Sequence, residues 1–75
     1  MADEFSFNIE ETFGVISTSK TGWTTELNKV KWGNHSAKYD IRPWDPEHRK
    51  MGKGITFTSE ELKALKSLLN EIEIN

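Results

Sequence analysis

The chain contains no cysteine and only two prolines among its 75 residues. Without cysteine it can form neither a disulfide framework nor a thiolate zinc site, and redox chemistry on sulfur is excluded. No segment approaches the roughly 20 apolar residues that a membrane-spanning helix needs. The start MADEFSFNIEE is acidic and lacks a basic region followed by an apolar run, so no secretion signal is predicted. We therefore expect a soluble cytoplasmic protein with no membrane partner and no cofactor.

The length of the chain predicts one small domain over residues 1–75. A chain of this size buries only about 60% of the surface that it exposes when unfolded. Charged residues make up 29% of the chain and hydrophobic residues 35%, which is typical of a globular rather than a disordered chain. Because the core must be thin, we expect a partner subunit to add stability.

The net charge of −2 conceals an uneven distribution of charge along the chain. Residues 1–19 carry four acids and no base, whereas residues 20–53 carry eight bases and four acids, a local charge of +4. Residues 54–75 carry two bases and four acids, a local charge of −2. The field of a local patch matters more for binding a polyanion than the charge of the whole molecule. The central segment is therefore the candidate binding region.

Alternating side chains predict strands in the first half of the chain. Phe5, Phe7 and Ile9 alternate with polar residues, and TFGVIS continues this strand beyond a kink near Glu10 and Glu11. The turn formers of STSKTG predict a hairpin loop after it. The next segment, WTTELNKVKW, has the composition of a strand but imperfect alternation, which a bulge would repair.

The second half of the chain predicts two more strands and a helix. KYDIRPW at residues 38–44 and GITF at residues 54–57 are the predicted strands. Thr58 and Glu61 fit a capping box, so a helix is expected to begin at about Ser59. Phe57 and Leu62 occupy the positions of a hydrophobic staple. The apolar stripe of the helix follows at three- to four-residue spacing: Leu62, Leu65, Leu68, Leu69 and Ile72.

These elements predict an α+β fold, a four-stranded antiparallel sheet followed by one amphipathic helix. One helix covers only one face of such a sheet, so the other face should be open. The residues expected beneath the helix are Tyr39, Ile41, Ile55 and Phe57. Those expected on the open face are Lys38, Arg42 and Trp44.

Three tryptophans lie within or beside the basic segment, and this mixture is typical of proteins that bind single strands. A base stacked on an aromatic ring contributes about 1–3 kcal/mol, and cations track the phosphates. We interpret Trp44 as a stacking residue because it shares a face with Arg42, and Trp23 as a core residue. In GKG, the glycines could let the backbone approach a phosphate while Lys53 supplies charge. The bases of the segment are Lys20, Lys29, Lys31, Lys38, Arg42, Arg49, Lys50 and Lys53.

Two alternatives come from other classes of function. The same open face could hold an acidic protein partner, in which case binding would not favour single over double strands. A metal-dependent nuclease could in principle use the carboxylates and imidazoles of this region. Its candidate ligands are His35, Asp40, Asp45, Glu47 and His48. Against a nuclease, DPE is a common turn sequence in which Asp45 hydrogen-bonds the nearby backbone. Asp40 is expected to pair with a lysine or arginine across strands. The side chains of Glu47, His48 and Arg49 are expected to be solvated.

The residues YDIRPWDPE and GKGITFTSEELKAL, taken together, resemble the single-strand-binding domain of the positive cofactor four transcriptional coactivators. The resemblance is to the small bacterial YdbC-like branch in particular. It covers residues 38–69 and consists of an Asp-Ile-Arg strand, an Asp-Pro-Glu turn, a Lys-Gly-Ile strand and an amphipathic helix. One departure is Pro43 with a single Trp44, where the family often has two adjacent aromatics.

The resemblance implies a curved sheet and a homodimer whose helices pack together, with two paired nucleic-acid grooves. The base-stacking and phosphate-binding positions of the family then correspond to Trp32, Arg42, Trp44 and Lys53, and Lys38 is similar in kind to its loop lysines. We therefore expect a non-enzymatic protein that binds single-stranded DNA with little sequence preference, in transcription or DNA maintenance. Single-stranded RNA offers the same kinds of contact, so the pattern does not distinguish the two.

Overall fold

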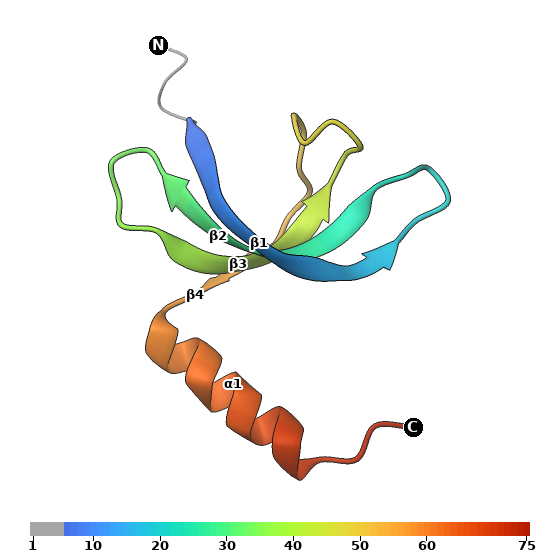
Figure 1. Ribbon diagram of the computed structural model, residues 1–75, viewed down its shortest axis with the longest axis vertical. Coiled ribbons are helices and arrows are strands. Elements are labelled where there is room, and N and C mark those ends of the chain that lie inside the picture. Colours follow the sequence, from blue (N-terminus) through green and yellow to red (C-terminus); the bar gives the residue numbers. More distant parts are fainter. Residues whose placement is uncertain (1–5) are drawn as a thin grey trace.

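The computed structural model describes residues 6–75, and Phe5 of the predicted first strand lies outside them. The four strands form one antiparallel sheet in the order β1-β2-β3-β4, and a helix follows (Figure 1). This confirms the predicted ββββα fold. The elements are β1 (Phe7–Thr18), β2 (Thr24–Trp32), β3 (Lys38–Trp44), β4 (Ile55–Phe57) and α1 (Ser59–Glu71).

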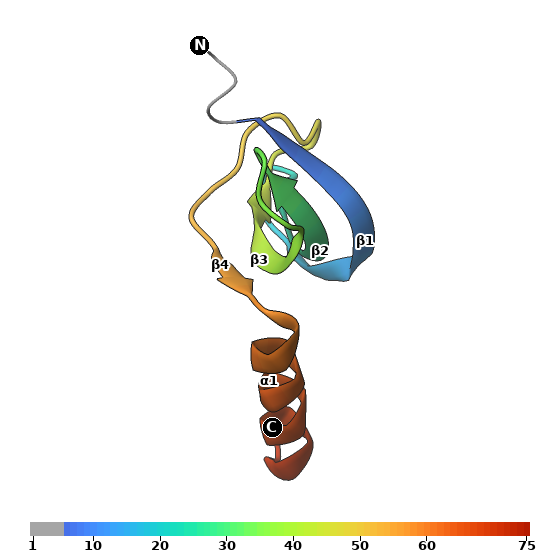
Figure 2. The same cartoon turned by 90° about the vertical axis from the view of Figure 1, so that its left-hand side faces the viewer.

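β1 is strongly bent because it is longer than the strand with which it pairs. Its 12 residues pair with the nine of β2 through three register shifts, between Ile9 and Glu11, between Thr12 and Gly14, and after Val15. Each shift places one extra β1 residue opposite a continuous β2, and such bulges bend a strand and increase its twist. The first shift coincides with the predicted kink. Figure 2 shows β1 bending round one side of the sheet.

β2 itself is regular, so the bulge predicted for it is wrong. It pairs with β3 without interruption from Thr24 to Val30. Its buried side chains alternate strictly, and they are Glu26, Asn28 and Val30. The hydrophobic alternation looked imperfect because two polar side chains occupy buried positions of this strand.

The curved sheet forms a cup with its hollow side facing away from α1 (Figure 1). On the convex side, Leu27 and Ile41 line a hollow together with Leu62 and Leu65 of α1. Tyr39 lies beside Leu62 in a neighbouring hollow. The prediction that Tyr39 and Ile41 face the helix is therefore confirmed. The parity of β2 and β3 directs the even-numbered side chains into the cup.

The helix begins where its capping residues predict. The Thr58 side chain accepts a hydrogen bond from the Glu61 amide at 3.1 Å, and the Thr58 amide donates to the Glu61 side chain at 2.8 Å. This reciprocal pair confirms the capping box. It satisfies two backbone groups at the junction of β4 and α1, so the start of the helix is set locally.

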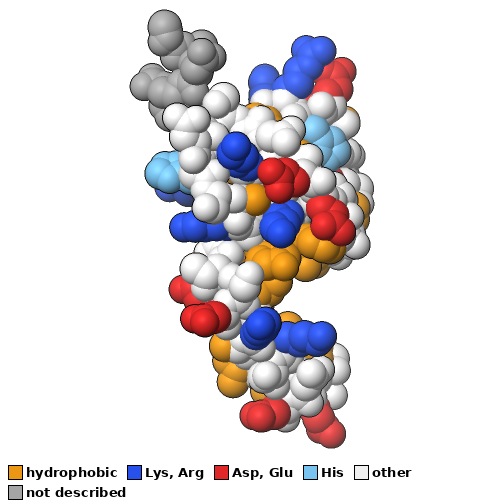
Figure 3. All heavy atoms as spheres, turned by 60° about the vertical axis from the view of Figure 1, so that its left-hand side comes forward, with side chains coloured by type: hydrophobic (Ala, Val, Ile, Leu, Met, Phe, Trp, Pro, Cys, Tyr) orange, Lys and Arg blue, Asp and Glu red, His pale blue; other side chains and the backbone are white. Residues whose placement is uncertain are grey.

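α1 leaves most of its apolar stripe exposed, and none of its residues is buried. Leu68, Leu69 and Ile72 are 59%, 47% and 54% exposed, and Ile55 of β4 is 55% exposed. Figure 3 shows hydrophobic side chains uncovered where the sheet meets the helix. The described part of the chain contains no helix long and apolar enough to cross a membrane.

Candidate nucleic-acid interface

The inside of the cup is a small core of aromatic and polar side chains. Trp44, Val30, Asn28 and Asp40 are fully buried, and Glu26 is 3% exposed. All five come from β2 and β3. A buried carboxylate or amide is costly unless it is hydrogen-bonded, so these polar groups need partners within the cup.

Trp44 is buried, and the expectation that it lies uncovered on an open face is wrong. The Phe7 ring lies 5.3 Å from the Trp44 ring, tilted by 48°. The His48 imidazole lies 5.8 Å away at 26°, nearly parallel to the indole. The coiling of the sheet brings Phe7, which pairs with Trp32, over the far end of β3. In a flat sheet Trp44 would lie uncovered on its face, but here the sheet closes over its own hollow side.

Trp32 and Arg42 form a stacked pair inside the cup, which we call the Trp32–Arg42 platform. The Arg42 guanidinium carbon lies 4.6 Å from the centroid of the Trp32 ring. Phe7 packs against the same indole at 5.8 Å. Arginine planes and aromatic rings are both surfaces on which nucleobases stack. Trp32 and Arg42 are each partly exposed, so the platform reaches the surface on the hollow side.

Asp40 holds the guanidinium of this platform in place. Arg42 Nε and Nη2 donate to the two Asp40 carboxylate oxygens at 2.7 and 2.8 Å. The Arg42 side chain is 15% exposed and that of Asp40 is fully buried. Pairing of Asp40 with a base was predicted, but the partner lies two residues along the same strand rather than across the sheet. Asp40 offsets the positive charge of Arg42. The guanidinium therefore acts as a fixed flat surface for stacking rather than as an unpaired cation.

Glu26 is the centre of a second hydrogen-bonded cluster. It accepts from the Thr24 hydroxyl at 2.5 Å, from Asn28 at 3.2 Å, and pairs with His48 Nε2 at 2.7 Å. Burial raises the pKa of Glu26, but the hydrogen bonds from Thr24, His48 and Asn28 outweigh it, so its pKa lies below the usual value. Sequence reasoning missed Phe7, Glu26 and His48 as parts of the site. A signal for Glu26 was present in the sequence: Glu26 and Asn28 alternate with Val30 along β2, so their side chains point to the same side of the sheet.

The loop after β3 is organised by Asp45, as the DPE turn predicts. Its carboxylate accepts from the backbone amides of Arg49 and Lys50 at 2.7 Å each and of Glu47 at 3.3 Å. The hydrogen bond from the Lys50 amide contributes most to lowering the pKa of Asp45, and those from the Arg49 and Glu47 amides add to it and together outweigh the opposing effect of desolvation. Arg49 pairs with Glu47 at 3.4 Å, and both side chains remain largely exposed. His48 is exposed, as expected for this loop, but its ring also turns back onto Trp44.

The predicted nuclease ligands do not gather at one point. Asp45 binds backbone amides, Asp40 binds Arg42, and His48 binds Glu26. Within residues 6–75, no three acidic, histidine or cysteine side chains are placed so that they could hold a metal ion.

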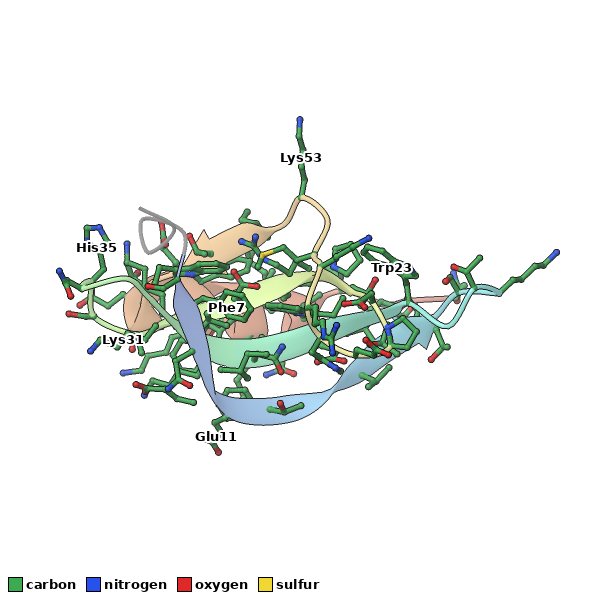
Figure 4. All side chains as sticks on the ribbon, turned by 90° about the horizontal axis from the view of Figure 1, so that it is seen from above. Phe7, Glu11, Trp23, Lys31, His35 and Lys53 are labelled. Atoms are coloured by element: carbon green, nitrogen blue, oxygen red, sulfur yellow. The ribbon has the colours of Figure 1, made fainter. Side chains whose placement is uncertain are left out.

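The predicted basic residues divide between the two sides of the sheet. Lys38 pairs with Val30 and therefore shares the hollow side, and it is exposed. Lys53 projects from the loop before β4 (Figure 4). Lys29 lies 5.7 Å from the Tyr39 ring on the convex side, and Lys31 shares its parity. The remaining three, Lys20, Arg49 and Lys50, lie on exposed loops.

Trp23, interpreted as a core residue, is partly exposed and not among the fully buried side chains. It lines an open hollow of about 460 Å³ with the loop after β3, including Pro46, Arg49 and Lys50. Trp23 lies at the opposite end of the sheet from Lys31 and His35 (Figure 4). The fully buried tryptophan is thus Trp44, whereas Trp23 is only partly buried.

The chain is similar to a known family and to a known protein. The model of the family described as Transcriptional Coactivator p15 (PC4) matches residues 19–68. Along 73 residues, the chain is 42% identical to an uncharacterized protein of Treponema pallidum (strain Nichols), an alignment that covers 97% of this chain and 86% of that protein. The family match includes all of β2, β3 and β4, and hence the Trp32–Arg42 platform.

Proposed function

Because the chain belongs to the Transcriptional Coactivator p15 (PC4) family, we propose that it binds single-stranded DNA, through the hollow side of its sheet and without catalysing a reaction on it. The family is a nucleic-acid-binding and non-enzymatic one. The observation that carries the proposal is the Trp32–Arg42 platform, with its 4.6 Å separation. It supplies a stacking surface that depends on no particular base.

Unpaired bases stack on this platform, and lysines beside it contact the phosphates. Stacking accepts every base because each one has a π face, so we expect little sequence preference at this point. Lys38 and Lys53 are the lysines best placed to contact the backbone, since Lys38 is exposed on the hollow side and Lys53 projects outward from the loop before β4. Duplex DNA keeps its base faces covered, and the platform therefore favours single strands.

The other predicted basic residues take different parts in this proposal. Lys20, Arg49 and Lys50 lie at the Trp23 end of the molecule and extend the path of a longer strand. Lys29 and Lys31 lie on the convex side, where they contribute long-range attraction rather than direct contact.

The same proposal includes a homodimer formed through α1 and the convex side of the sheet. An exposed apolar stripe at helical spacing is costly in water and is typical of an interaction surface. Small domains often gain stability from a second subunit. Two copies related by a twofold axis would bury Leu68, Leu69 and Ile72 and leave both hollow sides open.

Finer assignments follow from the resemblance in β3, β4 and α1. We place the chain in the YdbC-like branch of the family, acting in the cytoplasm in transcription or DNA maintenance, with single-stranded RNA as a competing ligand. The shared residues Asp40, Ile41 and Arg42, together with the Lys53-Gly54-Ile55 run, support this placement.

Titration of the full chain with oligothymidine, followed by tryptophan fluorescence at several salt concentrations, tests the proposal. We expect quenching and an affinity that falls as salt rises. Competition with duplex DNA of the same length should displace little of the oligothymidine. Absence of salt-sensitive binding would overturn the proposal, and equal competition by duplex or by an acidic protein would favour the acidic-partner alternative instead.

A further inference from the structure

The imidazole of His48 covers the indole of Trp44 much as a stacked base would. The two rings are 5.8 Å apart and 26° from parallel. The His48 side chain is 41% exposed, whereas Trp44 is fully buried. The imidazole therefore lies at the molecular surface with the indole beneath it.

The same imidazole also makes a polar contact of the kind that a base edge makes. His48 Nε2 lies 2.7 Å from Glu26 Oε2, at a carboxylate that is only 3% exposed. The other Glu26 oxygen accepts from Asn28, and Oε2 also accepts from Thr24. A buried carboxylate held in this way is a fixed acceptor beside an aromatic face. Together these groups form a site for a flat ring that carries N–H donors.

The loop that carries His48 can release the imidazole without unfolding. Its hydrogen bonds are made by Asp45 and the backbone, including the His48 amide to the Asp45 carbonyl at 2.9 Å. The imidazole makes none of these. His48 has a φ of 60°, a left-handed conformation that is uncommon for residues other than glycine. Rotation of the His48 side chain would therefore remove one of the rings that cover Trp44 and leave the hydrogen bonds of the loop intact.

We propose that His48 occupies a nucleobase site, and that a guanine of the bound single strand displaces it, stacks on Trp44 and donates N–H groups to Glu26. This inference rests on the proposed function and adds a base preference to it. Guanine presents a ring N–H beside an exocyclic amine, two donors on one edge. Thymine and uracil present a single N–H between two carbonyl oxygens. A carboxylate repels these oxygens. Glu26 is then the residue that determines specificity, and His48 lowers affinity until it is displaced.

The experiment compares two probes, an oligothymidine and the same oligothymidine with one central guanosine. Their affinities are measured for the full wild-type chain and for His48→Gly, Glu26→Gln and His35→Gly, and the indole N–H signal of Trp44 is followed by NMR. Glycine suits the left-handed backbone at position 48, so His48→Gly should remain folded. His35 is exposed in the turn between β2 and β3 and provides the matched histidine control.

We expect the guanosine probe to bind the wild-type chain several-fold more tightly than oligothymidine and to shift the Trp44 indole signal. His48→Gly should tighten binding of the guanosine probe by roughly tenfold, because the charge-assisted contact with Glu26 no longer has to be broken. Glu26→Gln should abolish the preference, and His35→Gly should behave like the wild type.

The inference fails if both probes bind equally while oligothymidine still binds in a salt-sensitive manner, which leaves the proposed function standing. It also fails if His48→Gly binds both probes as the wild type does, or if guanosine leaves the Trp44 signal unmoved. If neither probe binds the wild-type chain, the proposed function fails and the inference fails with it.

Discussion

The guanidinium of Arg42 stacks on Trp32 although the two residues are far apart in the register of the sheet. Arg42 pairs with Glu26, six residues before Trp32 in β2, yet the guanidinium carbon lies 4.6 Å from the indole centroid. In a flat sheet six residues span about 20 Å. The pair therefore exists only because the sheet is curved, and the three bulges of β1 are part of that curvature.

Replacing Trp32 should weaken single-strand binding more than any other change to an exposed ring. Trp32→Ala removes the stacking surface and should cost about 1–3 kcal/mol of binding free energy for oligothymidine. Trp32→Phe keeps a smaller ring and serves as the control, with an intermediate affinity. Fluorescence titration measures both, and wild-type affinity for Trp32→Ala would contradict a platform role.

Lysines on the two sides of the sheet should differ in their effect on binding. Lys53→Ala removes a phosphate contact, so the slope of log affinity against log salt should fall by about 0.7. Lys29→Ala removes the same charge from the convex side, where Lys29 lies over Tyr39. It should change the slope far less. Equal effects of the two substitutions in a salt series would mean that the strand does not follow the hollow side.

A charge on the apolar stripe of α1 should disrupt the proposed homodimer. Leu68 is 59% exposed in the single chain, and Leu68→Glu would place a carboxylate in an apolar interface, where an unpaired charge is expensive. Ser67→Glu adds the same charge on the opposite side of the helix and is the control. Sedimentation analysis should show a dimer for the wild type and Ser67→Glu, and a monomer for Leu68→Glu. A monomeric wild type would refute the dimer.

The cluster around Glu26 should make stability depend on acidic pH. Because the pKa of Glu26 in the folded chain lies below its usual value of 4.5, the unfolded chain binds the proton more readily. The stabilisation is then complete above about pH 4.5 and is lost as the pH falls through the folded pKa. Urea unfolding between neutral and acidic pH should show a shallower fall for Glu26→Gln than for the wild type. Parallel curves would show that Glu26 does not contribute.

Gly54 should resist any substitution that adds a side chain. A Cβ there would overlap Arg42 Cβ and the carbonyl oxygen of Ile41, because the chain passes directly against β3 before entering β4. Gly54→Ala should destabilise the fold by about 1–3 kcal/mol. Gly14→Ala is the matched control, since a Cβ at Gly14 meets nothing within 4 Å. Urea unfolding compares the stability of the two variants. If Gly54→Ala were as stable as the wild type, the close approach of Gly54 to β3 would be contradicted.

Much of the fold could be predicted from the sequence because it depends on neighbours in the chain. The Thr58 and Glu61 cap, the Asp45 turn and the strand at Lys38–Trp44 are each set by residues a few positions apart. The bulges of β1 were predicted only at the first of three positions, since the residues at the other two are all exposed and no buried face marks the register there.

The candidate site was predicted less completely, because its contacts join distant parts of the chain. Arg42 and Trp32 were identified, but Phe7 and the Glu26 pair with His48 were not. The sequence by itself determined the order of elements, the basic centre of the chain and the apolar stripe of the helix. Only the tertiary structure decided which tryptophan is covered. Curvature brings Phe7 and His48 onto Trp44 and leaves Trp23 at the surface, and no local pattern records how far a sheet coils.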